Sequence, residues 1–251
     1  MSTKPDWPAG VGRIILDEID STNAEAARRA PKLTIPTWIL AHRQTKGRGR
    51  RGRPWADPAG NFSASLLMFP EEPLDRVAQN SFVVALALYH ALRDVAPSEG
   101  YALKWPNDVL LNGTKIAGIL LETSGSTAKV DWLVIGTGVN LAHAPEIADL
   151  EARATVPSCL EAQLGLRPAP EALLAALAHH FEELRATYLQ RGFEAIRAQW
   201  LALAANLGGI VTARTMREDI TGSFEDLDQE GNLILRTAKG RVAITAADIF
   251  F

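Results

Sequence analysis

Apolar positions fall into short alternating runs in some parts of the chain and into helical periods in others. The runs that predict strands in the first two thirds of the chain are RIILDEI (13–19), TWILAHR (37–43), FSASLLMF (62–69) and DWLVIGTGVNL (131–141). Helical periodicity covers residues 75–96, 171–189 and 193–205, and the first of these helices is expected to be the central packing element. Another helix is predicted to begin at Thr22, where TNAE fits the T-x-x-E capping box.

Residues 101–122 contain two apolar runs on either side of Asn112-Gly113, the strongest short signal for a β-hairpin. A two-residue turn predicts these cross-strand pairs: Leu111 with Thr114, Leu110 with Lys115, and Asp108 with Ala117. Asp108 and Lys115 then lie on one face, about 7–8 Å apart at the backbone. They form either an ordinary ion pair or the edge of a ligand site. The ligand site is favoured because Ala117 and Gly118 leave space above the sheet and Lys104 lies nearby without an obvious partner.

The sequence pattern changes at Gly208, after which short strand-like runs alternate with glycine-containing turns. The segments expected as strands are GIVTAR, GSFEDLD, NLILRT and RVAITAAD. Regular short strands predict a small β-barrel of about 45 residues. We therefore expect an α+β protein in two domains, a large one over residues 1–206 and a small all-β one over residues 207–251.

Composition fits a folded, cytoplasmic protein. Of the 251 residues, 47% are hydrophobic and 22% charged, which excludes a disordered or fibrous chain. The lone Cys159 cannot form a disulfide within the chain. No apolar run is long enough to span a bilayer, so no membrane association is expected, and the N-terminus lacks the apolar core of a signal peptide. A formal net charge of -3 argues against a protein that binds nucleic acid over its whole surface.

Against this acidic background, QTKGRGRRGRPW at residues 44–55 places five basic side chains among glycines. The glycines match the G-x-G-x-x-G dinucleotide fingerprint, but Arg53-Pro54-Trp55 is a poor start for the helix that this fingerprint needs. A solvated basic arm would explain the charge but not the glycines. Because glycine allows close backbone approach and arginine binds phosphate through two parallel hydrogen bonds, the segment predicts a phosphate-binding loop.

Two glycines, Gly136 and Gly138, interrupt the apolar strand at GTGVN. Glycine weakens a strand unless the backbone bulges or another group approaches it closely. The sequence leaves both explanations open, a β-bulge and contact with a ligand.

Five motifs together resemble those of biotin protein ligases. They are STN at Ser21–Asn23, Q-x-x-GRGRRGR-x-W at Gln44–Trp55, KWPND at Lys104–Asp108, K-x-AG-I-L-x-E at Lys115–Glu122 and G-x-G-x-N at Gly136–Asn140. Their order and spacing match, and the C-terminal strands resemble the SH3-like domain that follows in that family. The implied fold is a mixed β-sheet flanked by helices, of the class II synthetase and biotin-lipoyl ligase type, with a small C-terminal SH3-like β-barrel.

The resemblance implies an ATP-dependent ligase that forms an amide bond. In the family's first step, the biotin carboxylate attacks the α-phosphorus of ATP to give biotinyl-5′-AMP and pyrophosphate. A lysine of a biotin carboxyl carrier protein domain, from acetyl-CoA carboxylase or another acyl-CoA carboxylase, then attacks the mixed anhydride. ATP, Mg²⁺ and the substrate biotin are therefore expected. The alternatives are a lipoate ligase or octanoyl transferase that acylates carrier lysines, and a noncatalytic nucleic-acid binder.

The resemblance also implies roles for individual residues. The biotin site would comprise Ser21, Thr22, Asn23, Gln44, Gly47, Arg48, Gly49, Arg50, Lys115 and Gly118. The ATP site would comprise Arg50, Arg51, Arg53, Trp55, Lys104, Asn107, Lys115 and Asn140. The residues expected to act in catalysis are Lys115, Arg48, Arg50 and Asp108. Asp108 would assist Mg²⁺ binding or receive the ammonium group of the incoming lysine, and the sequence does not choose between these roles.

Further expectations concern the state of the protein. The glycine-rich loop is expected to be mobile when empty and to fold over the adenylate, which excludes water. A homodimer is compatible with the resemblance, because many relatives pair through the edge of the central sheet. A DNA-binding domain is not expected, since few residues precede RIILDEI. The terminal ITAADIFF lacks an arginine that matches the nucleotide contact of some relatives, so a role of this domain at the nucleotide is left open.

Overall fold

The computed structural model describes residues 7–56, 58–126, 129–145 and 155–251. A seven-stranded sheet forms its centre, with the strand order β1-β2-β3-β7-β6-β5-β4. Its strands are β1 (Gly12–Leu16), β2 (Thr37–Ala41), β3 (Phe62–Met68), β4 (Tyr101–Lys104), β5 (Asp108–Leu111), β6 (Thr114–Gly125) and β7 (Val130–Val139). β1 and β2 run parallel to each other, whereas the other neighbours pair antiparallel. The prediction of a mixed sheet is therefore confirmed.

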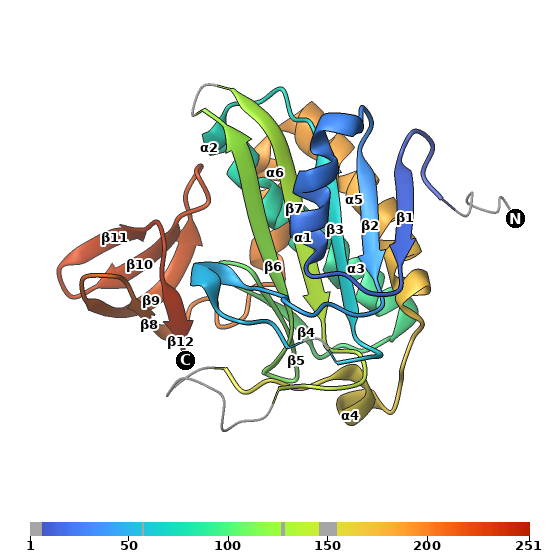
Figure 1. Ribbon diagram of the computed structural model, residues 1–251. Helices are drawn as coiled ribbons and strands as arrows, with labels where there is room; N and C mark the ends of the chain where they lie inside the picture. The colour runs from blue at the N-terminus through green and yellow to red at the C-terminus, as the bar shows by residue number, and fades with distance from the viewer. Residues whose placement is uncertain (1–6, 57, 127–128, 146–154) are drawn as a thin grey trace, which may run out of the picture.

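Helices cover both faces of this sheet (Figure 1). The helices of the structure are α1 (Thr22–Arg29), α2 (Leu74–Ala78), α3 (Asn80–Val95), α4 (Leu160–Leu164), α5 (Pro170–Arg191) and α6 (Phe193–Ala202), and the 3₁₀ turns are η1 (Ala30–Lys32) and η2 (Arg50–Gly52). α1 lies on one face, where Ala26 packs against Ile39 and Val134. α3 and α5, the latter predicted from periodicity together with α6, lie on the other face, where Trp38 meets Phe181 edge-on. Within the described ranges, no helix combines the length and apolarity needed to cross a membrane.

α3 is the central packing element that periodicity predicts, and its Leu88 has no exposed surface. The helix predicted over residues 75–96 is nevertheless interrupted at Gln79, where α2 ends and α3 begins. The chain makes shorter i→i−3 hydrogen bonds there, from the backbone N of Gln79 to Arg76 and from that of Phe82 to Gln79, at 3.1 and 3.0 Å. Such bonds tighten the turn, so two helices replace the expected one.

The hairpin between β5 and β6 has the predicted two-residue turn, in which Asn112 and Gly113 adopt φ angles of 50° and 77°. Two predicted cross-strand pairs are confirmed: Leu111 with Thr114 and Leu110 with Lys115. The third is wrong, because a β-bulge shifts the register and places Asp108 opposite Gly118 instead of Ala117.

A five-stranded antiparallel sheet, which we call the C-terminal sheet, has the order β11-β10-β9-β8-β12. Its strands are β8 (Ile210–Arg214), β9 (Asp219–Leu227), β10 (Leu233–Thr237), β11 (Gly240–Ile244) and β12 (Asp248–Phe250). The sequence predicts the first four but not β12, which begins where the last predicted strand ends. Trp105 joins the two sheets, since its Nε1 donates to the carbonyl oxygen of Gly231 at 3.0 Å. β12 lies beside the basic loop that contains η2 (Figure 1).

Candidate active site

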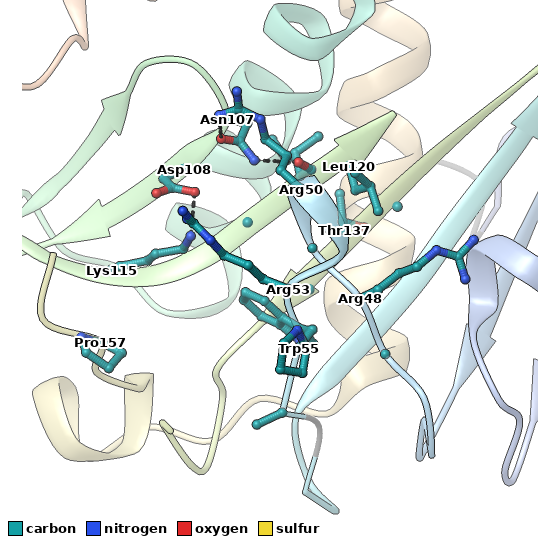
Figure 2. Close-up of a pocket in the computed structure, with 18 of the residues that line it drawn as sticks. Arg48, Arg50, Arg53, Trp55, Asn107, Asp108, Lys115, Leu120, Thr137 and Pro157 are labelled. Carbon is teal, nitrogen blue, oxygen red and sulfur yellow. Dashed lines mark hydrogen bonds and ion pairs between the residues drawn. The ribbon is translucent and has the colours of Figure 1, made fainter. Parts of the chain in front are cut away.

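The predicted site residues surround one cavity of about 900 Å³. Its walls are the central sheet, β12 and residues 46–55, which we call the arginine loop. Figure 2 shows side chains of this loop facing those of the sheet. From the predicted set, the lining comprises Ser21, Thr22, Asn23, Gln44, Gly47, Arg48, Gly49, Arg50, Arg53, Trp55, Lys104, Asn107, Asp108, Lys115, Gly118 and Asn140. Arg51 is outside this lining, and its guanidinium group pairs with Asp248.

One end of the cavity, which we call the neutral end, is formed by the STN motif and Gln44, with two buried serines of β3 behind them. Thr22 donates from its backbone N and its Oγ1 to Oε1 of Gln44, at 2.8 and 3.1 Å. Gln44 Nε2 donates in turn to Oγ of Ser63 at 2.9 Å. Oγ of Ser65 lies 2.7 Å from Oγ1 of Thr22 and 2.6 Å from Oδ1 of Asn23. Because these groups bond to one another while buried, the neutral end is a preorganised polar surface without a formal charge.

Helix α1 begins at Thr22, as predicted, but its N-cap is Ser21. The Ser21 hydroxyl accepts a hydrogen bond from the backbone N of Ala24 at 3.4 Å. The capping box predicted at Thr22 is therefore wrong, because the residue three positions after the N-cap Ser21 is Ala24, which has no polar side chain to complete a box. Thr22 is the first helical residue, and its hydroxyl points to Gln44 instead.

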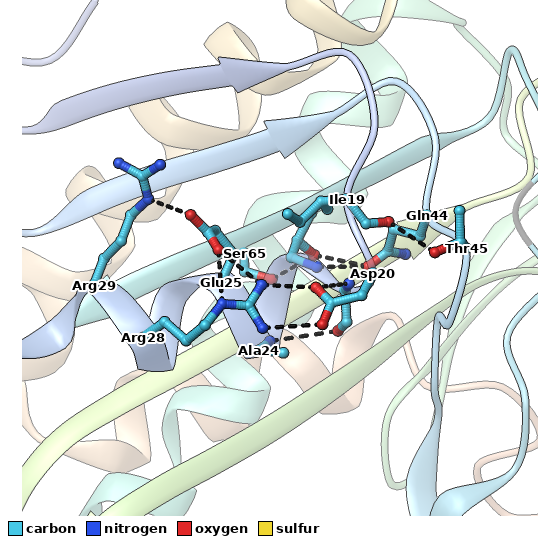
Figure 3. A network of polar contacts seen from close by, with 11 residues as sticks. Ile19, Asp20, Ala24, Glu25, Arg28, Arg29, Gln44, Thr45 and Ser65 are labelled. Atoms are coloured by element: carbon cyan, nitrogen blue, oxygen red, sulfur yellow. Dashed lines mark hydrogen bonds and ion pairs between the residues drawn. The ribbon is translucent and has the colours of Figure 1, made fainter.

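Asp20 ties the STN motif to the arginine loop. Its Oδ1 accepts from the backbone N of Ser21, and its backbone O accepts from the N of Lys46, both at 2.7 Å. Arg28 donates to both oxygens of the Asp20 carboxylate and also to Glu25 (Figure 3). The hydrogen bonds from Arg28 lower the pKa of Asp20 to about 2. This network joins the start of α1 to the start of the arginine loop.

The opposite end, which we call the charged end, contains Lys104, Asp108, Lys115 and the side chain of Arg50. Lys115 Nζ lies 2.7 Å from Oδ1 of Asp108, so the bulge in the hairpin still lets these residues form an ion pair. Lys104, which the sequence leaves without a partner, donates to Oγ1 of Thr155. Burial lowers the pKa of Lys104, and the charge of Asp108 opposes this shift.

The glycines of β6 and β7 make room for side chains of the protein. β7 pairs without a register shift at Gly136 and Gly138, so the bulge considered for these positions is wrong. A Cβ at Gly136 would lie 2.2 Å from Oδ1 of Asn23, and one at Gly138 would lie 2.6 Å from the indole of Trp55. Gly118, opposite Gly138, completes this surface, since a Cβ there would lie 3.2 Å from the same indole. Close approach therefore accounts for both glycines of GTGVN.

The arginine loop lies across the cavity as a closed turn. The backbone N of Gly49 donates to the backbone O of Arg53 at 2.8 Å. Arg50 donates to Oδ1 of Asn107 at 3.3 Å, and burial lowers the pKa of this arginine. A desolvated guanidinium interacts strongly with an anion, which suits a site for phosphate or carboxylate. Mobility of the loop without ligand stays a prediction.

Two carboxylates hold the arginine loop from opposite sides. Arg48 pairs with Glu122 of β6, with an Nη2–Oε1 distance of 3.0 Å. Arg51 and Arg53 pair with Oδ2 of Asp248 in β12, at 2.8 and 2.9 Å. Burial raises the pKa of Asp248, but the hydrogen bond from Arg53 and the charges of both arginines outweigh it, so the pKa is lowered overall. The C-terminal sheet thus contributes directly to one wall of the cavity.

Sequence reasoning missed four contributors, Ser63, Ser65, Glu122 and Asp248. The two serines could have been found from the sequence, because FSASLLMF places them at alternating positions and therefore on one face of a strand. Glu122 belongs to the K-x-AG-I-L-x-E motif but received no role. Asp248 carried no signal, since nothing in a short β-strand marks one carboxylate as the partner of an arginine 197 residues away.

Two stretches of the chain match known protein families. Residues 15–140 match the Biotin/lipoate A/B protein ligase family, and residues 207–251 match the Biotin protein ligase C terminal domain. The biotin--[acetyl-CoA-carboxylase] ligase of Paracoccus denitrificans is 48% identical over 238 residues, which cover 94% of this chain and 99% of that protein. The bifunctional ligase/repressor BirA of Bacillus subtilis is 30% identical, over 94% of this chain and 73% of the relative.

A solved structure agrees in fold. The biotin protein ligase from Aquifex aeolicus in complex with biotin and ATP has a TM-score of 0.80 and 28% identity, and the match covers 95% of this chain and 97% of that one. The chain belongs to the biotin/lipoate A/B protein ligase family. Its C-terminal match and its relatives distinguish it further as a biotin protein ligase, so the predicted enzyme class is confirmed and the lipoate alternative is disfavoured.

Proposed function

We propose that this biotin protein ligase forms biotinyl-5′-AMP inside the cavity and then transfers the biotinyl group to a lysine of a carrier protein. One observation carries the proposal: a single cavity has a neutral end and a charged end, and the arginine loop spans both. Biotin has the same division, because its ureido ring is neutral and its opposite end is a carboxylate. The carboxylate would therefore point toward the cations that receive the ATP phosphates.

The ureido ring is proposed to bind at the neutral end. Its carbonyl oxygen and two N–H groups need hydroxyl and amide partners, which Ser21, Thr22, Asn23 and Gln44 supply. A charged side chain there would lose its hydration without gaining a charged partner. The uncharged composition of this end therefore supports a neutral ligand.

The first step joins two anions. A carboxylate oxygen of biotin attacks the α-phosphorus, a new P–O bond forms, and the bond to pyrophosphate breaks. Cations fixed near the reacting atoms offset the repulsion and the charge that builds up in the transition state. We assign this role to Lys115, which would exchange Asp108 for an oxygen between the two reactants, and to Arg50.

The adenosine part is proposed to lie against Trp55 and Asn140. The Trp55 indole rests on Gly138 and offers a broad apolar surface for a purine. The buried Oδ1 of Asn140 has no hydrogen-bond partner among the described residues, and it would accept a hydrogen bond from a purine amino group. Arg53 also lines the cavity, where a phosphate would compete with Asp248 for its guanidinium group.

Mg²⁺ is proposed to enter together with ATP. In the described part of the chain, no three His, Cys, Asp or Glu side chains form a cluster that could hold a metal ion. Mg²⁺ keeps several waters and takes one or two carboxylates beside substrate phosphates, so Asp108 is sufficient as a protein ligand. The bound ion would neutralise phosphate charge. Asp108 is equally suited to accept a proton from the incoming lysine.

The proposed acceptor is a lysine in a biotin carboxyl carrier protein domain of acetyl-CoA carboxylase or another acyl-CoA carboxylase, as the name of the Paracoccus relative supports. The neutral amine attacks the acyl carbon of the adenylate, AMP leaves, and an amide bond forms. We expect the reaction to occur in the cytoplasm, without specific DNA binding. Homodimer formation stays a prediction. The outer strand β1 forms one edge of the central sheet, through which two copies could pair.

The adenylating step can be tested by itself. The protein is mixed with Mg²⁺-ATP and labelled pyrophosphate, and either biotin, lipoate or octanoate is added. Label should enter ATP with biotin alone. Exchange with lipoate or octanoate instead would refute the proposed substrate, and no exchange with any acid would refute the adenylation chemistry.

A further inference from the structure

Glu122 lies outside the cavity but contacts residues of both the neutral end and the arginine loop. Its Oε2 accepts a hydrogen bond from Nδ2 of Asn23 at 2.7 Å. The Arg48 guanidinium donates to the same carboxylate, from Nη2 to both oxygens at 3.0 Å and from Nε to Oε1 at 3.2 Å. One carboxylate therefore holds a buried amide and a loop arginine at the same time.

The contact with Glu122 determines which way the Asn23 amide faces. A carboxylate only accepts hydrogen bonds, so Asn23 must turn its NH₂ group to Glu122 and its oxygen to the other side. On that side, Oδ1 lies 2.6 Å from Oγ of Ser65, above Gly136. Oδ1 of Asn23 then has one lone pair left, and this lone pair can accept a hydrogen bond from an N–H group in the cavity.

The pair with Glu122 also determines where Arg48 points. Figure 2 shows the Arg48 side chain directed away from Lys115 and Asp108. The resemblance gives Arg48 a place over the biotin carboxylate and the α-phosphate, but here its guanidinium group is engaged by Glu122. Arg48 thus fixes the beginning of the arginine loop to β6, while its neighbour Arg50 faces the charged end.

We propose that Glu122 is a positioning residue that couples the neutral end to the arginine loop. It orients the Asn23 oxygen toward a ligand N–H, and it holds the beginning of the loop over the cavity through Arg48. The inference rests on the proposed function for the identity of this ligand, a ureido ring. Biotin binding and loop closure then depend on one side chain that touches neither reactant.

An ordinary surface ion pair is the simplest alternative. The side chains of Arg48 and Glu122 are 37% and 32% exposed, and such a pair alone would contribute little. The carboxylate is shared, however, with Asn23, which is 5% exposed and lines the cavity. Replacing Glu122 would therefore affect a ligand-binding amide as well as a surface arginine, which the simple alternative does not predict.

Glu122→Gln tests the proposal, because glutamine keeps the size but can donate as well as accept. The KM for biotin should rise about tenfold, the loss expected for a charge-assisted hydrogen bond. The KM for ATP and kcat should change less than the KM for biotin, because Glu122 contacts no residue of the charged end and Arg50 keeps its own hydrogen bond to Asn107. Glu122→Asp, which retains the charge, should recover part of the affinity for biotin. An unchanged KM for biotin in Glu122→Gln would overturn the proposal.

The matched control is Glu225→Gln. Glu225 is also shared by two basic partners, Arg236 and Arg241, but it lies in the C-terminal sheet outside the cavity lining. This variant should leave both KM values unchanged. An equal rise of the KM for biotin in Glu225→Gln would show a general effect of charge removal and would refute the specific role of Glu122.

Limited proteolysis tests the loop anchor without any ligand. Trypsin should cut after Arg48 several-fold faster in Glu122→Gln than in the wild-type protein and the Glu225→Gln control, because the beginning of the loop is released. Equal cutting rates would refute the anchor. The two proposals fail separately: wild-type protein without biotin-dependent exchange contradicts the function, whereas active wild-type protein with equal trypsin rates contradicts the role of Glu122.

Discussion

The neutral end and the charged end of the cavity are built in opposite ways. At the neutral end, side chains from α1 and β3 satisfy one another, as in the bonds of Thr22 and Ser65. At the charged end and along the arginine loop, cations come from a hairpin and a loop, and carboxylates hold several of them, as in the pairs of Lys115 with Asp108 and of Arg53 with Asp248. A neutral site can therefore be complete before its ligand arrives, whereas a cationic site needs internal anions that the ligand replaces.

Removing the central cation should have the largest effect. Lys115→Ala is expected to slow biotinyl-5′-AMP formation about 10²–10³-fold, because a charge-assisted contact that strengthens in the transition state is lost. Biotin binding measured by calorimetry should change much less, since the neutral end stays intact. The exposed Lys239 provides the control, and its replacement by alanine should leave the rate unchanged. An unaltered rate in Lys115→Ala would remove this residue from the mechanism.

Two glycines of one strand allow each end to be disturbed separately. The added methyl group of Gly136→Ala would meet Asn23, and that of Gly138→Ala would meet the indole of Trp55. Overpacking of this kind costs about 1–3 kcal/mol. Gly136→Ala should therefore bind biotin, and Gly138→Ala should bind ATP, roughly tenfold or more weakly than the wild-type protein. Steady-state kinetics should give a raised KM for biotin in Gly136→Ala and a raised KM for ATP in Gly138→Ala.

Each of these variants serves as the control for the other, because they lie two positions apart on the same strand and face the same side. Thermal unfolding should show similar stability losses for both. If both variants raised both KM values equally, the cavity would respond as one unit and the separation into two ends would be wrong.

How much of this site the sequence predicts depends on whether a contact is local. Hairpin geometry placed Asp108 and Lys115 together, because a two-residue turn fixes the pairing close to it. The bulge escaped prediction, since it depends on packing rather than on the turn. All residues that the motif resemblance predicted for the site, except Arg51, line the cavity. The resemblance could not supply Asp248, whose contact with Arg51 requires two sheets to be placed side by side.

Replacing Asp248 tests what its carboxylate does to Arg51 and Arg53. It either positions the two arginines for the nucleotide or competes with the nucleotide for them. Asp248→Asn should raise the KM for ATP about three- to fivefold, because Arg51 and Arg53 lose a shared partner and must be ordered on binding. The KM for biotin should stay constant. Asp219→Asn, which removes the partner of Arg214 elsewhere in the C-terminal sheet, is the control. A lower KM for ATP would mean that competition dominates.

The smallest effect concerns the network behind the neutral end, at Asp20. Its pKa of about 2 lies below the usual 3.8, so the folded state favours the ionised form. The stabilisation is therefore complete above about pH 4 and fades as the pH falls toward 2. Because the pair is exposed, Arg28→Ala should lower the melting temperature only slightly at pH 6. This difference from the wild-type protein should shrink on acidification, and carboxyl NMR titration should place the pKa of Asp20 near its usual value in the variant. A pKa that stays near 2 in Arg28→Ala would assign the shift to the backbone turn at Ser21 instead.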